Sequence, residues 1–65
     1  MIRNVIRMQN DHVLVFDESG EQLSQYQGEY KRVKDKILRD APAGARFFHW
    51  YDSRPEPVSV TPENW

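Results

Sequence analysis

The stretch Gly28-Glu-Tyr-Lys-Arg-Val-Lys-Asp-Lys-Ile-Leu-Arg-Asp40 decides the fold, because it has the pattern of an amphipathic helix. Its apolar stripe, counted from just before the stretch, consists of Tyr26, Tyr30, Val33 and Ile37. These residues are spaced four, three and four apart, which aligns them along one side of a helix. Pro42 cannot continue a helix, and it disfavours helical conformation at Ala41. We therefore predict a helix from Gly28 to Asp40, with Gly28 at or near its N-cap.

Short segments with strand character lie on both sides of this helix. The predicted strands are Ile2–Met8, His12–Phe16, Glu21–Ser24, Arg46–Tyr51 and Val58–Val60. The first two form a hairpin around Gln9-Asn-Asp11, since Asn and Asp tolerate the backbone of tight turns. Alternation divides the first strand into two faces, with Ile2, Ile6 and Met8 on one and Arg3, Val5 and Arg7 on the other. The third strand rests on one clear apolar side chain, Leu23.

Together these elements predict one compact α+β domain over residues 1–65. We expect a small antiparallel sheet of three to five short strands, in the order strand, strand, (strand), helix, strand, (strand). The amphipathic helix packs on one face of this sheet. Because a single helix covers a single face, the other face of the sheet is expected to remain open to water.

The segment Thr61–Trp65 has the features of a helix start. Thr61 suits the N-cap, and Pro62 suits the first helical position. Either the chain ends in one turn that folds Trp65 back onto the domain, or the sequence is a fragment of something longer.

Size and charge exclude several classes of function. A chain of 65 residues buries only a thin core, and without cysteines it forms neither disulfides nor thiolate zinc sites. Nine Lys and Arg residues against ten Asp and Glu residues argue against a dedicated electrostatic DNA binder. No run approaches the roughly 20 apolar residues of a membrane span, and Met1–Met8 lacks the apolar centre of a signal peptide. We expect a cytoplasmic protein without membrane contact.

No motif in the sequence specifies a reaction, a metal or a cofactor. His12 and His49 are the only histidines, and neither lies in a motif with metal-ligand spacing. The serines lie in turns and short strands without a nucleophile elbow, and the three glycines are isolated rather than grouped in a phosphate-binding loop. We therefore predict a protein that is not an enzyme and that uses no cofactor and no metal.

The segment Arg46-Phe-Phe-His-Trp-Tyr51 is the most informative one for function. Side chains of a strand alternate between faces, so one set comprises Phe47, His49 and Tyr51, and the other comprises Arg46, Phe48 and Trp50. One set packs under the helix, and the other faces the open side of the sheet. The candidate binding surface comprises Arg46, Phe48 and Trp50, with Arg3, Arg7 and Arg54 as flanking cations.

Two kinds of partner suit such a surface. Exposed aromatic side chains and strand edges commonly bind other proteins, and self-association as a homodimer would also strengthen the thin core. The alternative is single-stranded RNA or DNA, whose bases stack on sheet-surface aromatics beside arginines. Against both stands a structural interpretation, in which every aromatic side chain closes the core and Trp65 folds across the open face.

Overall fold

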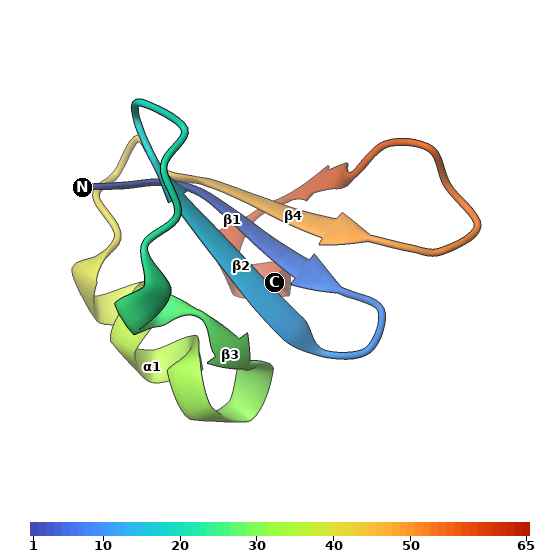
Figure 1. Cartoon of the computed structure of the whole chain (residues 1–65), viewed down its shortest axis with the longest axis horizontal. Helices are drawn as coiled ribbons and strands as arrows, with labels where there is room; N and C mark the ends of the chain where they lie inside the picture. The colour runs from blue at the N-terminus through green and yellow to red at the C-terminus, as the bar shows by residue number, and fades with distance from the viewer.

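A five-stranded sheet carries the one α-helix on one of its faces (Figure 1). The computed structural model describes all residues from Met1 to Trp65. The strands are β1 (Ile2–Met8), β2 (His12–Asp17), β3 (Gly28–Glu29), β4 (Arg46–Trp50) and β5 (Val58–Val60), in the spatial order β3-β2-β1-β4-β5. The helix α1 spans Tyr30–Asp40, and short 3-10 turns span Ser24–Tyr26 and Pro62–Asn64. This arrangement confirms the predicted α+β class and the packing of the helix against the sheet.

The sheet is mixed, so the predicted antiparallel pairing is wrong at one position. The central strand β1 pairs antiparallel with β2, as in the predicted hairpin, but it pairs parallel with β4. In the parallel ladder Val5 lies opposite Phe47, and in the antiparallel ladder it lies opposite Val15. The physical reason is the long connection from β2 to β4, which includes α1. A connection of this length lets the chain cross over and enter β4 in the direction of β1.

The helix begins two residues later than predicted, and the third strand lies elsewhere. Gly28 has a φ of 137°, which glycine adopts far more readily than other residues, and it pairs with Val13 as part of β3. The N–H of Tyr30 then donates to the main-chain oxygen of Asp11 at 2.8 Å, which ties the helix start to the β1–β2 turn. The predicted strand Glu21–Ser24 is reduced to one isolated bridge, between Gln22 and Phe16. The predicted helix end at Asp40 is confirmed.

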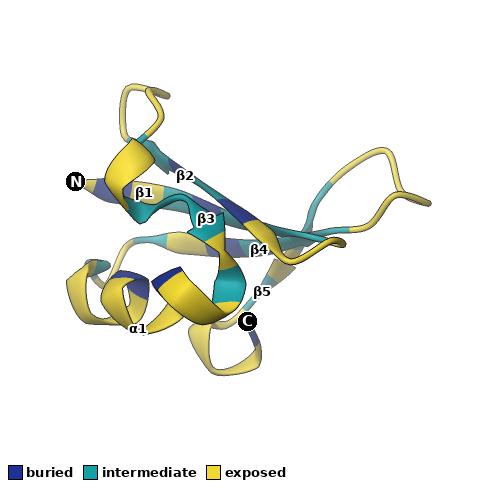
Figure 2. Cartoon of the chain, turned by 60° about the horizontal axis from the view of Figure 1, so that its bottom comes forward, coloured by how far each residue is buried: buried dark blue, intermediate teal, exposed yellow.

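The core lies between the sheet and α1 (Figure 2). Its buried residues are Ile2, Val5, Val13, Val15, Val33, Ile37, Phe47 and Trp65. The register of β1 against β2 shifts between Ile2 and Asn4, which inserts one extra residue into β1. Because of this bulge, Ile2 and Val5 are both buried in the same core, so the predicted division of the first strand into two faces is wrong at its start.

Trp65 closes the core on the helix side of the sheet. Its ring packs edge-on against Tyr30 and Phe47, with centroid separations of 5.1 and 5.0 Å. The prediction that a turn begins at Thr61 is confirmed, although the turn is of the 3-10 type. The interpretation that placed Trp65 across the open face is wrong, because Trp65 belongs to the same core as Val33 and Ile37. No helix in the structure combines the length and the apolar character that crossing a bilayer requires.

Candidate binding surface

The strand β4 directs its aromatic side chains to opposite faces of the sheet. Phe47 is buried under the helix against Trp65, and His49 also lies on that side, where its Nε2 is 3.1 Å from the main-chain oxygen of Trp65. Alternation therefore places Arg46, Phe48 and Trp50 on the face that α1 does not cover. The sequence grouped these three residues correctly but left undetermined which set faces outward.

Side chains of three adjacent strands meet on this uncovered face. Ile6 of β1 lies opposite Leu14 of β2 and opposite Phe48 of β4. Met8 lies opposite Trp50 one step further along the same ladder. We call this surface the open face, and it consists of the residues Asn4, Ile6, Met8, Leu14, Phe16, Arg46, Phe48, Trp50 and Ser59. Its six apolar members are all half-buried, and none belongs to the closed core.

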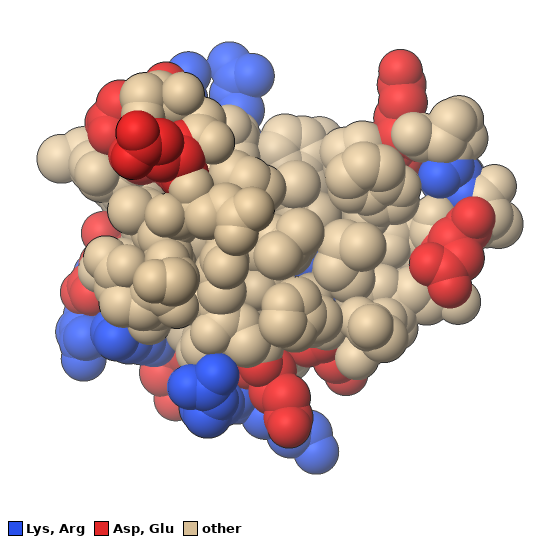
Figure 3. All heavy atoms as spheres, in the orientation of Figure 1, with Lys and Arg blue, Asp and Glu red and all other residues tan.

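Charge is sparse on the open face. Arg46 is its only charged member, and it sits at the amino end of β4. Figure 3 shows the molecule in the view of Figure 1, in which the C-terminal turn passes behind β1 and β2. A broad uncharged surface lies over the strands, and Lys, Arg, Asp and Glu side chains gather around its edge. The open face is therefore an apolar patch with a charged rim.

Arg7, which the sequence suggested as a flanking cation, points to the other side of the sheet. Its guanidinium carbon lies 3.5 Å from the centroid of the Tyr30 ring. Nη1 donates to the main-chain oxygen of Trp65 at 2.8 Å, while Nε and Nη2 approach Oδ1 of Asp11 at 3.0 and 2.9 Å. Through these contacts Arg7 holds the helix, the β1–β2 turn and the C-terminal turn together. The other two predicted flanking cations, Arg3 and Arg54, lie at different places in the structure.

Arg3 lies at the β1 bulge beside Gly44, in the loop that leads from α1 to β4. Arg54 lies in the loop between β4 and β5, and its main-chain oxygen accepts a hydrogen bond of 3.4 Å from Nε1 of Trp50. The structure thus puts Arg46, Phe48 and Trp50 on one face and brings the main chain of Arg54 against Trp50, whereas Arg3 and Arg7 stand apart.

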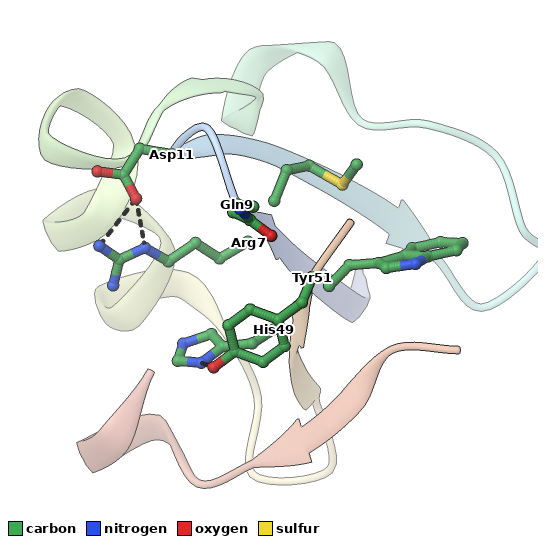
Figure 4. A pocket seen from close by; sticks show the side chains of 7 residues that line it. Arg7, Gln9, Asp11, His49 and Tyr51 are labelled. Carbon is green, nitrogen blue, oxygen red and sulfur yellow. Dashed lines mark hydrogen bonds and ion pairs between the residues drawn. The ribbon is translucent and has the colours of Figure 1, made fainter. Parts of the chain in front are cut away.

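A small pocket adjoins the open face at the carboxyl ends of β1 and β4 (Figure 4). It has a volume of about 260 Å³ and is lined by Arg7, Met8, Gln9, Asp11, His49, Trp50 and Tyr51. Met8 and Trp50 belong to both the pocket and the open face. Sequence reasoning missed the pocket, because it depends on the parallel pairing that brings these two strand ends side by side. Gln9 stabilises its wall by accepting a hydrogen bond of 2.8 Å from the N–H of Asp52.

His49 is fully engaged by its neighbours in the pocket wall. A carbonyl oxygen only accepts, so the Nε2 that faces the Trp65 oxygen carries the proton. In the neutral ring, Nδ1 then accepts from the hydroxyl of Tyr51 at 3.2 Å. No three His, Cys, Asp or Glu side chains group together in a way that could hold a metal ion. The arrangement of His49 is suited to fastening the C-terminal turn to β4.

The side chains with shifted pKa values lie away from the open face. At the end of α1, hydrogen bonds from Arg39 and from the Tyr26 hydroxyl lower the pKa of Asp40. The hydrogen bond between Tyr26 and Asp40 in turn raises the pKa of Tyr26. In the turn after β2, hydrogen bonds from the Ser19 hydroxyl and from the N–H groups of Glu21 and Ser19 lower the pKa of Asp17. These groups stabilise a helix end and a turn.

Comparisons with protein-family models, with curated proteins and with solved structures found no match for this chain. Any statement of its function therefore rests on its own residues and on their arrangement.

Proposed function

We propose that this chain is a small non-catalytic binding protein that contacts another protein through the open face. The observation that carries the proposal is the set of six apolar side chains that stay half-exposed across β1, β2 and β4. Contiguous apolar patches with polar rims on the surface of a folded protein are typical of interaction sites. Aromatic residues and Met, which dominate the β1–β4 part of this patch, are also enriched at the centres of protein interfaces.

The composition of the open face supports a protein partner over single-stranded nucleic acid. Phe48 and Trp50 have the flat rings on which bases stack, but nucleic-acid binding also needs cations to neutralise phosphates. Only Arg46 supplies one on this face, since Arg7 is bound by Asp11 on the opposite side. The chain as a whole has a formal net charge of -1. An apolar protein surface matches these properties better than a polyanion does.

The edges of the sheet support binding through the face rather than by strand addition. The outer edge of β5 is only three residues long, and Pro57 and Pro62 flank it closely. Proline has no N–H to donate, so a partner strand could pair over a short distance only. At the opposite edge, β3 has two residues and runs directly into α1. Neither edge provides the long unpaired ladder that strand addition uses.

Site-specific photocrosslinking tests the proposal directly. Phe48 is replaced by p-benzoylphenylalanine, and the protein is irradiated in cells of the source organism. The control carries the same amino acid at Lys31, which is exposed on α1. We expect protein adducts from position 48, containing a second copy or another protein, and only background from position 31. Equal labelling at both positions, no adducts at all, or adducts with nucleic acid from position 48 would contradict the proposal.

A further inference from the structure

We infer that the pocket at the carboxyl ends of β1 and β4 binds a small uncharged molecule with a planar heteroaromatic ring and a hydrogen-bond acceptor. The pocket lies at one end of the sheet and shares only Met8 and Trp50 with the open face. The inference does not depend on the proposed function. It is carried by the path of the chain around the pocket, by the aromatic lining, and by the pairing of the charged groups in that lining.

The order of the strands leaves a crevice at this end of the sheet. β1 and β4 are parallel neighbours, and Met8 lies opposite Trp50 where both strands end. From there the chain turns from β1 towards β2 and from β4 towards β5, which lie on opposite sides of the pair (Figure 1). In open sheets with parallel strands, ligands bind in the crevice outside the carboxyl ends, at the point where the connections diverge in this way. The pocket occupies this position.

The size and the lining of the pocket suit a single ring system. Its volume of about 260 Å³ lies just below the range of about 300–1,000 Å³ that is common for ligand sites, so the ligand must be small. The rings of His49 and Tyr51 meet edge to face, with centroids 6.0 Å apart, and form one wall (Figure 4). Trp50 and the thioether of Met8 also line the pocket. Aromatic rings and thioethers both make favourable contacts with a planar ring.

The charged groups that line the pocket are paired with each other. Nε and Nη2 of Arg7 approach Oδ1 of Asp11, and Nη1 donates to the main-chain oxygen of Trp65. The two ring nitrogens of His49 are also engaged, one by the Trp65 oxygen and one by the Tyr51 hydroxyl. A charged ligand would therefore lose its hydration without gaining a free counter-charge. The pocket favours an uncharged molecule.

One polar group in the lining remains available to a ligand. Oε1 of Gln9 accepts a hydrogen bond from the N–H of Asp52 at 2.8 Å, which fixes the orientation of the side-chain amide. Nε2 of Gln9 makes no hydrogen bond within the chain, so its N–H groups can donate to a ligand. A carbonyl oxygen or a ring nitrogen on the ligand would accept from them. A planar ring with such an acceptor thus matches both the aromatic wall and this donor.

Proton–nitrogen correlation NMR of the full chain, recorded during ligand titrations, tests the inference. The two probes are nicotinamide and uracil, which are uncharged and planar and carry a carbonyl acceptor. The matched controls are nicotinate, which is an anion, and cyclohexanecarboxamide, which lacks the aromatic ring. We expect at least one probe to shift the signals of Met8, Gln9 and Trp50 with a dissociation constant on the order of 1 mM. Both controls should bind at least about 5-fold more weakly.

Three results of these titrations would overturn the inference. The first is that neither probe saturates the shifts at a concentration of about 20 mM, well above the expected dissociation constant. The second is that a control binds as tightly as the better probe. The third is that the shifted signals belong to residues outside the pocket.

A variant of Gln9 tests the proposed donor. Gln9→Glu keeps an oxygen for the N–H of Asp52 but removes the N–H groups, so it should weaken binding of the better probe about 5-fold, the loss expected for one neutral hydrogen bond. Gln25→Glu makes the same chemical change at an exposed residue outside the pocket and should leave the affinity unchanged. If Gln9→Glu binds as tightly as the wild type, Gln9 is not the donor and the inferred recognition is wrong.

An oligonucleotide of uridines distinguishes a free small molecule from a base within nucleic acid. It should bind no more tightly than uracil, because the lining has no free cation for its phosphates. Tighter binding of the oligonucleotide would assign the pocket to nucleic acid and overturn its assignment to a small molecule.

Discussion

Replacement of Trp65 by alanine should remove a large part of the folding free energy. The Trp65 side chain is 3% exposed and packs edge-on against Tyr30 and Phe47. Truncation of a buried Trp to Ala typically costs about 3–5 kcal/mol, through lost apolar burial and the cavity that remains. A chain of this length has a total stability of roughly 3–10 kcal/mol. Trp65→Ala should therefore lower the melting temperature by at least about 12 °C, and it leaves a substantial unfolded fraction in the marginal case.

Trp65→Phe is the matched control, because it keeps an aromatic ring in the core but removes the indole N–H, whose burial is unfavourable. Its indole Nε1 is buried without a hydrogen-bond partner, which costs about 1–3 kcal/mol. Phenylalanine keeps most of the ring contacts and removes this unpaired N–H, so the two effects oppose each other. We expect Trp65→Phe to stay within about 1.5 kcal/mol of the wild type. Urea unfolding followed by circular dichroism measures both variants. The packing argument is refuted if Trp65→Ala unfolds at the wild-type midpoint, and the argument about the unpaired N–H is refuted if both variants lose equal stability.

Three further predictions test other parts of the structure. Gly28→Ala should destabilise the fold by about 1–3 kcal/mol and by more than Gly20→Ala, because the φ of 137° at Gly28 lies further from the left-handed region open to alanine than the φ of 88° at Gly20, whereas the Arg32 guanidinium near Gly28 can move aside; thermal melts of both variants compare them. Hydrogen bonds lower the pKa of Asp17 in the folded chain below its ordinary 3.8, so they stabilise the fold above that pH, and this contribution is lost as pH falls through the lowered pKa. The stability difference between wild type and Asp17→Asn should therefore shrink in urea titrations below about pH 4, and a constant difference would contradict this assignment. Fluorescence anisotropy with labelled single-stranded oligonucleotides should show no binding at low salt; binding that weakens with salt and disappears in Trp50→Ala would favour nucleic acid as the partner.

The sequence was sufficient for the helix and for the alternation of β4, because both follow from local spacing. The stripe through Tyr30, Val33 and Ile37 and the stop at Pro42 fix α1 to within two residues of its observed start. Strand alternation alone puts Phe48 and Trp50 on one face. Neither inference requires knowledge of which segments are neighbours in space, and this is why both agree with the structure.

What the sequence could not supply was the set of long-range neighbours. The parallel pairing of β1 with β4 depends on the path of the intervening chain, and no residue in either strand encodes its direction. The bulge near Arg3 changes which residues of β1 face the core, although the apolar pattern alone suggests regular alternation. From the sequence, Arg7 is expected to be an exposed cation. In the structure it is held on the helix side of the sheet by Tyr30 and Trp65, two residues that are distant from it in the sequence. The pocket could not be predicted either, because its walls are the ends of β1 and β4, which become neighbours only through the parallel pairing.

The parallel pairing of β1 with β4 also has a consequence for the order of folding. The hairpin of β1 and β2 closes a short turn and can form within microseconds, whereas β4 joins only after the connection through α1 has closed. Until then, β1 has one unpaired edge in a chain whose apolar side chains are still exposed. An edge of that kind is a template for pairing with other chains. Docking of β4 is therefore the step in which folding and aggregation compete, and mutations in β4 should affect refolding yield more than those in the β1–β2 turn.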